Sequence, residues 1–518
     1  MFRPVAWLPA VAALLPLAVY LLSSRAADIE AVRTAATTNA FRPLVADERP
    51  AQPRLAPASR EAEARLKQFR LAPGLKVDLW AAEPMLANPV AFSVDERGRV
   101  FTSETYRYRT SALDIRHYMF MLEDDLAART VEDRLAMIRK WFGPEGEAAL
   151  SRETEVIRLI EDTDGDGRAD RSSVFAEGFT SPLSGIGSGV LARRGEVWFT
   201  EIPSLWRISP TNLVSRAAGP ARSAGSLPAA PGTQAADGGP AARPTASGRR
   251  SDPLDSLRST PRIMDGFQAV ELLRGFGVRF SFTGHDLHGL KFGPDGRLYF
   301  SVGDRGAHIV TQEGTVIDLP DEGAVFRCEP DGSRLEVVHR GLRNPQELAF
   351  NEYGDLFTGD NDSDQGDRER WVQVIEGADS GWRVGHQHAP LGNAGMWNLE
   401  RLWVPHFPGQ AAYIVPPIAN IGDGPGGLVH DYGTSLPEAL KGRFLLAYFK
   451  GTSAQSGIYS LKLRPAGAGY ELVTHDEFVW NSLVPDVDLG PDGSIFFADW
   501  HEGWPKSNKG RLYRAYFP

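Results

Sequence analysis

One acidic segment of the chain has the spacing of a loop that surrounds a hard cation with oxygen ligands. In the run Asp-Thr-Asp-Gly-Asp-Gly-Arg-Ala-Asp at 162–170, carboxylates stand at positions 1, 3, 5 and 9, and the glycine at position 6 permits a sharp turn. Ser173 stands where an EF-hand has its bidentate glutamate, so the loop is not a full EF-hand. We predict a calcium site with a structural role; a solvated acidic hairpin is the alternative. The predicted ligands are Asp162, Asp164, Asp166, the Arg168 carbonyl and Asp170.

A second group combines residue types that suit proton transfer. His285 and His288 stand where the chain enters one apolar strand, in Gly-His-Asp-Leu-His-Gly at 284–289, and Asp304 follows the strand after it. Two histidines with a carboxylate at the exit of the same repeat are typical of a general base and its orienting partners. A purely structural histidine is the alternative. We predict that His285, Asp304 and Arg343 are catalytic residues.

Three further stretches carry polar residues with more than one possible role. Arg343, next to Asn344-Pro345, could present a fixed fork of donors to an anionic or carbonyl group, or could tie parts of the fold together through backbone carbonyls. The acidic run at 360–367 fits no standard cation cage, so a metal site and a polar turn both remain open. A late set of aromatic and polar residues suits a sugar-like ligand, although most of its tryptophans are expected in the core. The set is Trp382, His386, His388, Asn420, Asp423, Lys450, Asp486, Asp499, Trp500, His501 and Trp504.

The elements that must position these residues come from one repeated unit, which consists of an apolar strand, a tight glycine turn and an aromatic or β-branched strand. Glycine is favoured because such turns need a positive φ, and the flanking residues favour a pleated, half-buried surface. The six copies lie at residues 90–102, 189–199, 290–300, 348–357, 428–446 and 487–497. They predict an all-β fold, a six-bladed β-propeller over residues 71–518. A β-sandwich is the competing interpretation, but it would not give six similar hairpins over so long a chain.

Two insertions explain the irregular spacing of the turn glycines. Residues 113–143 carry a helical pattern of apolar residues in the first blade region. Residues 209–262 form a low-complexity tract of Ala, Pro, Gly and Ser, which we expect to be a disordered loop in the second. With both removed, the glycine intervals are about 45–90 residues, in the range of decorated propeller blades. Functional loops are then expected at one mouth of the propeller.

The N-terminal segment and the composition bear on location and partners. Residues 1–26 contain Arg3, an apolar run and small residues, which is typical of a signal peptide or a membrane anchor, and residues 27–70 read as a stalk or linker. We therefore expect a periplasmic or cell-surface location, with the N-terminal segment as a possible anchor. The formal charge of −10 argues against a general nucleic-acid binder. The single cysteine, Cys328, excludes an intrachain disulfide and a CxxCH haem-attachment motif.

Several longer motifs are together specific enough to indicate a family. They are Glu104–Arg109, Ser111–Arg116, Glu161–Gly167, Gly284–Leu290, Gly341–Glu347, Tyr413–Gly424 and Asp499–Trp504. In these motifs the chain resembles the propeller domain of the membrane-bound dehydrogenase family described from planctomycetes and verrucomicrobia. Members of that family commonly continue into helical repeats and a c-type haem domain. Since this chain has no CxxCH motif, the resemblance implies a separate electron acceptor such as a cytochrome c.

More distantly, the propeller is similar to the soluble quinoprotein glucose/sorbosone dehydrogenases, which hold pyrroloquinoline quinone (PQQ) and calcium. This resemblance implies that His285 is the catalytic base. It implies that Arg343 and Asn344 form a cofactor-contacting pair, and that Lys450 is the cofactor-contacting lysine. The family also has a pair of arginines before the last Asp-Gly turn. Here that stretch, residues 481–486, reads Asn-Ser-Leu-Val-Pro-Asp and contains no arginine.

Three functions are compatible with the sequence, and we rank them as follows. The first is an exported dehydrogenase that oxidises a sugar or polyol. In it, His285 takes the hydroxyl proton while hydride leaves for a quinone held by Arg343, Asn344 and Lys450. The second is a non-catalytic propeller that binds a glycan or a partner and holds structural calcium. The third is a lactonase-like hydrolase, in which calcium at the mouth polarises a carbonyl; this function needs carboxylates that converge on the central channel.

Overall fold

The computed structural model describes residues 54–211, 255–388, 396–402, 406–407, 410 and 414–518. The predicted signal peptide or anchor at 1–26, most of the predicted stalk at 27–70 and most of the low-complexity insertion at 209–262 lie outside the described residues. Among the residues that are described, no helix is long and apolar enough to cross a membrane.

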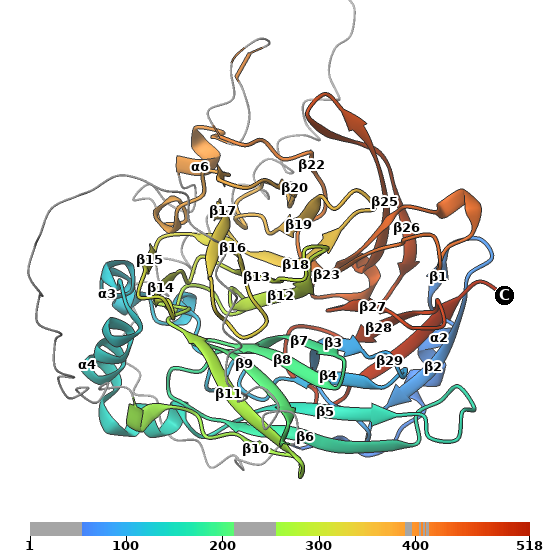
Figure 1. The fold of residues 1–518 in the computed structure, drawn as a ribbon, viewed down its shortest axis with the longest axis horizontal. Coiled ribbons are helices and arrows are strands. Elements are labelled where there is room, and N and C mark those ends of the chain that lie inside the picture. The colour runs from blue at the N-terminus through green and yellow to red at the C-terminus, as the bar shows by residue number, and fades with distance from the viewer. Residues whose placement is uncertain (1–53, 212–254, 389–395, 403–405, 408–409, 411–413) are drawn as a thin grey trace, which may run out of the picture.

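Six sheets are arranged in a ring around a central axis (Figure 1). The innermost strand of each sheet lies beside the innermost strand of the next, and the sixth returns to the first. In ring order these strands are β3 (Pro89–Val94), β7 (Gly187–Arg193), β12 (Leu287–Phe292), β18 (Pro345–Phe350), β23 (Pro425–His430) and β27 (Val487–Leu489). Each predicted hairpin is the innermost strand pair of one sheet, so the predicted six-bladed propeller is confirmed.

The outer strands complete the blades. Blade 1 adds β4 (Val100–Glu104), β5 (Glu155–Glu161), β6 (Arg171–Phe179) and β10 (Arg262–Ile263), and blade 2 adds β8 (Glu196–Glu201), β9 (Ser204–Pro210) and β11 (Phe267–Arg274). Blade 3 adds β13 (Leu298–Val302), β16 (Gly323–Cys328), β17 (Glu336–Leu342) and β21 (Ala378–Asp379), with a separate hairpin of β14 (Ala307–Val310) and β15 (Val316–Leu319). Blade 4 adds β19 (Leu356–Asp360), β20 (Arg370–Val374) and β22 (Ala419–Asn420). Blade 5 adds β24 (Phe444–Tyr448), β25 (Gly457–Ala466) and β26 (Gly469–Trp480), and blade 6 adds β28 (Ile495–Asp499) and β29 (Arg511–Tyr516).

The N-terminal strands close the ring. Strand β2 (Lys76–Ala82) pairs antiparallel with β29 and supplies the outermost strand of blade 6. Strand β1 (Arg70–Leu71) extends blade 5 by pairing with β26, and the short helix α2 (Glu61–Leu66) lies beside β2. Strands from the N-terminal part of the described chain thus pair with strands from its C-terminal part in blades 5 and 6, and this pairing closes the ring.

The helical segment lies between β4 and β5 of blade 1. It comprises α3 (Leu122–Ala127) and α4 (Val131–Leu150), and Thr130 and Asp133 form a capping box at the start of α4. Its apolar side chains pack against Val278, Phe280 and Phe282, which precede blade 3. The insertion therefore supports the segment that leads to His285. One further short helix, α6 (Met396–Leu399), precedes β22.

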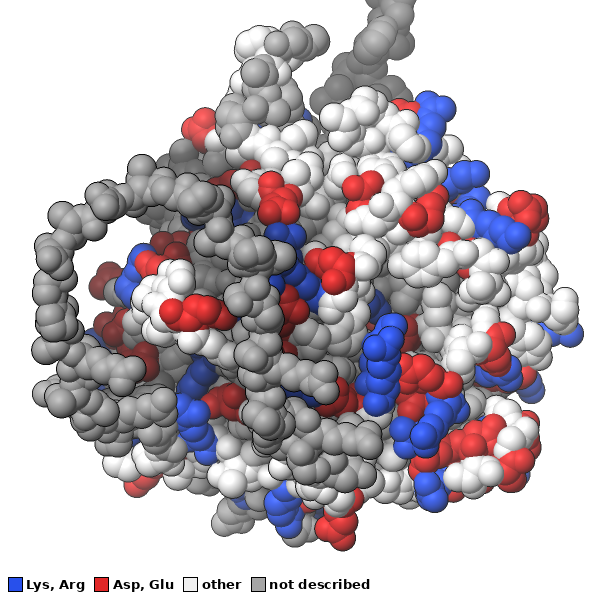
Figure 2. Space-filling model, viewed as in Figure 1, with Lys and Arg blue, Asp and Glu red and all other residues white. Residues whose placement is uncertain are grey.

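The order of antiparallel strands defines two faces of the ring. The connections between blades, and those from second to third strands, lie on one face, which we call the mouth face. The turns from first to second strands and from third to fourth strands lie on the other, the turn face. In the view of Figure 2, the described Lys and Arg residues are interspersed with Asp and Glu residues, so the charge is mixed over that surface.

Candidate functional site

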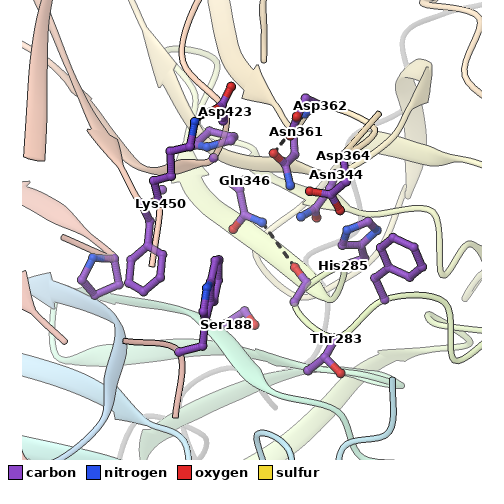
Figure 3. Close-up of a pocket in the computed structure, with 18 of the residues that line it drawn as sticks. Ser188, Thr283, His285, Asn344, Gln346, Asn361, Asp362, Asp364, Asp423 and Lys450 are labelled. Carbon is purple, nitrogen blue, oxygen red and sulfur yellow. Dashed lines mark hydrogen bonds and ion pairs between the residues drawn. The ribbon is translucent and has the colours of Figure 1, made fainter. Parts of the chain in front are cut away.

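A cavity of about 830 Å³ opens on the mouth face. Residues of all six blades line it, represented in ring order by Tyr108, Ser188, His285, Asn344, Lys450 and Trp500. Figure 3 shows His285 and Asn344 on one side of the cavity, Lys450 and Asp423 on another, and Gln346 between them. The mouth predicted to carry function therefore holds a large pocket, and three of the predicted site residues, His285, Asn344 and Lys450, line it.

His285 and Asp304 form a buried pair at the wall of this cavity. Nδ1 of His285 lies 2.7 Å from Oδ1 of Asp304, and the two residues are 4% and 1% exposed. Ser281 donates to the same carboxylate oxygen at 2.7 Å, and the Trp382 indole donates to the other at 3.0 Å. With Nδ1 engaged by Asp304, Nε2 is the ring nitrogen left for a ligand.

The surroundings keep this pair suited to accepting a proton. Burial lowers the pKa of His285; the Asp304 carboxylate opposes this shift, and the charge of Arg343 adds to it. Burial by itself would raise the pKa of Asp304, but the charges of His285 and Arg343 and the donated hydrogen bonds hold it below its usual range. A neutral imidazole beside an ionised carboxylate is the arrangement of a general base with an orienting partner.

Local backbone geometry explains how His285 reaches this place. A Cβ atom at Gly303 would lie 2.8 Å from both Asn344 Oδ1 and the His285 side chain, so only glycine fits between them. The helical insertion supplies a second support, since the Asp125 carboxylate accepts the backbone N–H groups of Phe280 and Ser281 at 2.7 and 3.1 Å. The insertion in blade 1 thus helps to position His285 of blade 3.

Arg343 lies behind the cavity wall and is not among the lining residues. Its side chain is 1% exposed; Nε donates to Gln387 Oε1 at 3.0 Å, and Nη2 lies 3.4 Å from Asp364 Oδ2. Its guanidinium lies over the rings of Phe282 and Trp382. Of the two roles open in the sequence, the described residues show neither a set of backbone carbonyls around the guanidinium nor its direct access to the cavity. Instead, Arg343 packs behind the wall, against Phe282 and Trp382.

Asn344 and Lys450 lie where a ligand could meet them. The buried Asp360 carboxylate accepts the backbone N–H groups of Arg343 and Asn344 at 2.9 and 2.7 Å and pairs with Arg370, which fixes the Arg-Asn segment. Lys450 is 45% exposed at its side chain and is ion-paired with Asp423. A ligand that contacts Lys450 must therefore share it with Asp423.

Acidic side chains of the 360–367 run also face the cavity, although the sequence left their role open. Asp362, Asp364 and Asp367 line it. Burial, with the neighbouring charge of Asp364, raises the pKa of Asp362 to about 7. Glu369 is fully buried, neither of its carboxylate oxygens has a hydrogen-bond partner among the described residues, and burial raises its pKa well above the usual range. Sequence reasoning missed Glu369, because its burial depends on packing between blades 4 and 5.

Of the late aromatic and polar set, Asp423, Lys450, Trp500 and Trp504 line the cavity. Trp382 instead lies in the interior, where it donates to Asp304, and Asp499 is buried and paired with Arg511. Arg116, which the sequence did not single out, lines the cavity from blade 1 and lies over the Phe282 ring at 4.2 Å. Its signal in the sequence was only its place in the Ser111–Arg116 motif.

The predicted calcium loop lies on the opposite face, in the turn from β5 to β6. Ligand atoms of Asp162, Asp164 and Asp166 lie within 4.8 Å of one another, which fits a single cation. Asp170 is turned toward Thr163, whose hydroxyl lies 2.7 Å from Oδ2. Three of the five predicted ligands thus converge, and they do so away from the cavity.

Comparisons with known proteins relate two parts of the chain to described families. Residues 278–514 match the family described as Glucose / Sorbosone dehydrogenase. This part of the chain is glucose/sorbosone dehydrogenase-like. Residues 61–214 match a domain of unknown function, DUF7133. No curated protein matches the chain. The resemblance to the planctomycete and verrucomicrobial family stays a prediction.

Solved structures with a similar arrangement include several sugar dehydrogenases. An oxidoreductase described as a glucose dehydrogenase from Thermus thermophilus has 16% identity and a TM-score of 0.45, over 85% of this chain and 100% of that one. PQQ-bound aldose sugar dehydrogenase from Streptomyces coelicolor has 14% identity and a TM-score of 0.44, over 86% and 99%. The PQQ domain of pyranose dehydrogenase from Coprinopsis cinerea has 10% identity and a TM-score of 0.44, over 91% and 100%.

Proposed function

We propose that this protein is an exported dehydrogenase that oxidises a hydroxyl group of a sugar or polyol with a quinone cofactor and calcium. The observation that carries the proposal is the buried His285–Asp304 pair at the wall of a large mouth-face cavity, within the segment that matches glucose/sorbosone dehydrogenases. A general base held by a carboxylate is what the removal of a hydroxyl proton requires.

The cavity fits a quinone such as PQQ. Its volume of about 830 Å³ lies toward the upper end of small-molecule sites, which span roughly 300–1,000 Å³. Two buried polar atoms, Asn344 Oδ1 of the lining and Arg343 Nη1 behind it, have no hydrogen-bond partner among the described residues. Asn344 and Lys450 would hold the cofactor directly. Arg343 would contribute its charge from behind the wall, or reach the cofactor by leaving Asp364.

In the proposed reaction, His285 accepts the hydroxyl proton at Nε2 as the C–H bond of the same carbon breaks. A bound quinone supplies the acceptor for the two electrons of the hydride. Asp304 stabilises the imidazolium that forms, since it already receives the Nδ1 hydrogen bond. The burial of His285 against Phe282, with ring centres 5.5 Å apart, keeps the base desolvated and neutral before substrate binds. The electrons would then pass to a separate acceptor such as a cytochrome c.

The lactonase-like alternative has less support. It needs several carboxylates that could hold one calcium ion at the mouth. Among the described residues, the only group of three or more close metal-binding side chains is the Asp162–Asp166 group on the turn face. At the mouth, Asp364 and Asp423 already face Arg343 and Lys450.

Reconstitution tests the proposal. The purified chain with PQQ and calcium should give a bound-cofactor spectrum and reduce an electron-accepting dye with at least one member of a panel of sugars and polyols. His285→Ala should lower kcat by about 10²–10⁴-fold while the bound-cofactor spectrum remains. His308→Ala is the matched control, because His308 also pairs with an aspartate, Asp318 at 3.0 Å, but on the exposed β14–β15 hairpin. If no sugar reduces the dye, or if His285→Ala keeps full activity, the proposal fails.

A further inference from the structure

The cavity has a second wall that the proposed chemistry does not use. It is made by the loops after β24 and β28, in blades 5 and 6, and carries Phe449, Trp500 and Trp504. His285 stands at the start of blade 3, and blades 3 and 6 are opposite each other in a six-membered ring. We call Phe449 and Trp504 the aromatic wall.

Trp504 is exposed and yet fixed. Its side chain is 48% exposed, which is unusual for the largest apolar residue, and its ring centre lies 5.2 Å from that of Phe449. A Cβ atom at Gly451 would lie 2.2 Å from the indole Nε1, so the glycine leaves space that the indole occupies.

The loop that carries Trp504 is also tied down. The Glu502 carboxylate accepts the backbone N–H of Ser453 at 3.1 Å and bonds its hydroxyl, which links the loops after β24 and β28. His501 reaches Glu61 of α2 at 3.1 Å. An exposed indole held in this way loses little conformational freedom when a ligand covers it, so more of the contact energy appears as affinity.

Polar groups flank the aromatic wall. The Lys450–Asp423 ion pair lies directly beside Gly451 and lines the same cavity. An aromatic face next to charged donors and acceptors suits a pyranose ring, because the C–H surface of the sugar packs on the indole and its hydroxyls meet the polar groups. A cavity of about 830 Å³ leaves room for more than one sugar unit.

From these contacts we infer that the mouth binds an oligosaccharide. One sugar unit lies at His285, and a further unit stacks on Trp504 across the cavity. This inference rests on the proposed function for the unit at His285, but the stacking at Trp504 requires no redox chemistry.

Direct binding to the cofactor-free protein tests the inference. Titrations with a monosaccharide and with its di-, tri- and tetrasaccharides, followed by calorimetry, should show at least about tenfold tighter binding of the longer ligands. Trp504→Ala should remove that gain, about tenfold in Kd, and leave monosaccharide binding unchanged. Gly451→Ala, which displaces the indole without deleting it, should have the same effect. Tyr353→Ala is the matched control, because Tyr353 is an exposed aromatic residue, 68% exposed, in the turn between β18 and β19 on the turn face.

The possible outcomes separate the two proposals. If oligosaccharide binding depended on Trp504 but no sugar reduced the dye, the oligosaccharide site at the aromatic wall would be supported and the dehydrogenase function would be rejected. Dye reduction with equal affinity for short and long saccharides, or an unchanged length dependence in Trp504→Ala, would overturn the oligosaccharide site. Circular dichroism and the melting temperature of each variant show whether a loss reflects the site or the fold.

Discussion

Two aspartate-rich loops, one on each face of the propeller, are similar in sequence and different in environment. The turn-face loop, residues 162–170, joins β5 to β6, and the mouth-face loop, residues 360–367, joins β19 to β20. Asp164 and Asp166 of the turn-face loop are exposed. Asp360 and Asp362 of the mouth-face loop are 0% and 7% exposed.

The difference determines what the carboxylates can do. In the turn-face loop the backbone N–H groups of Gly165 and Gly167 donate to the Asp162 carboxylate, and the exposed Asp164 and Asp166 carboxylates each accept one further backbone N–H. In the mouth-face loop Asp360 accepts hydrogen bonds from the backbone N–H groups of Arg343 and Asn344 and forms an ion pair with the Arg370 side chain. Burial penalises an unpaired charge. In the mouth-face loop, the paired Asp360 therefore fixes the cavity wall, whereas burial raises the pKa of Asp362, so that its carboxyl group binds a proton more tightly.

The largest expected effect concerns Asp362. Its pKa is raised by burial to about 7 from the ordinary value of 3.8, so the folded protein retains this proton between about pH 4 and pH 7 while the unfolded chain loses it. The folded state therefore loses stability as pH rises through this window, by up to about 4 kcal/mol above pH 7. Asp362→Asn should stabilise the protein relative to the wild type at pH 8 and much less at pH 4.5, as measured by denaturant unfolding at both values.

Asp164→Asn in the turn-face loop is the control for that comparison. It should not reproduce the difference between pH 8 and pH 4.5. If Asp362→Asn changed the free energy of unfolding equally at both pH values, the proposed burial of an unpaired carboxyl at the mouth would be wrong.

A somewhat smaller effect is expected for the aspartate of each loop that accepts a pair of backbone N–H groups, Asp360 in the mouth-face loop and Asp162 in the turn-face loop. Asp360→Asn leaves the buried Arg370 without its charge partner and should lower the free energy of unfolding by about 3 kcal/mol. Asp162→Asn, in a solvated loop, should cost about 1 kcal/mol or less. Equal costs for the two variants in thermal or denaturant unfolding would contradict the contrast between the loops.

A contrast between local contacts and contacts between blades explains which features could be predicted from the sequence. The six hairpins were predictable, because each depends on a local glycine turn and its flanking strands. The His285–Asp304 pair was also within reach: Leu287 pairs with Val302 across the β12–β13 hairpin, so residues two positions beyond each strand must meet. Three other features depend on contacts between different blades, so no local pattern in the sequence predicts them. They are the burial of Arg343, the burial of Glu369 and the fixed position of the Trp504 indole.

The smallest expected effect is calcium binding by the turn-face loop. Since Asp162, Asp164 and Asp166 converge at the protein surface, a calcium affinity of about 0.1–1 mM is reasonable, and 1 mM calcium would stabilise the folded state by about 1 kcal/mol. The melting temperature should rise by about 1–3 °C over that in chelator. Asp164→Asn should abolish the rise, whereas Asp364→Asn in the mouth-face loop should keep it. If the calcium-dependent rise in melting temperature persisted in Asp164→Asn and disappeared in Asp364→Asn, the calcium site would lie in the mouth-face loop. The turn-face loop would then not be the cation-binding loop of the pair.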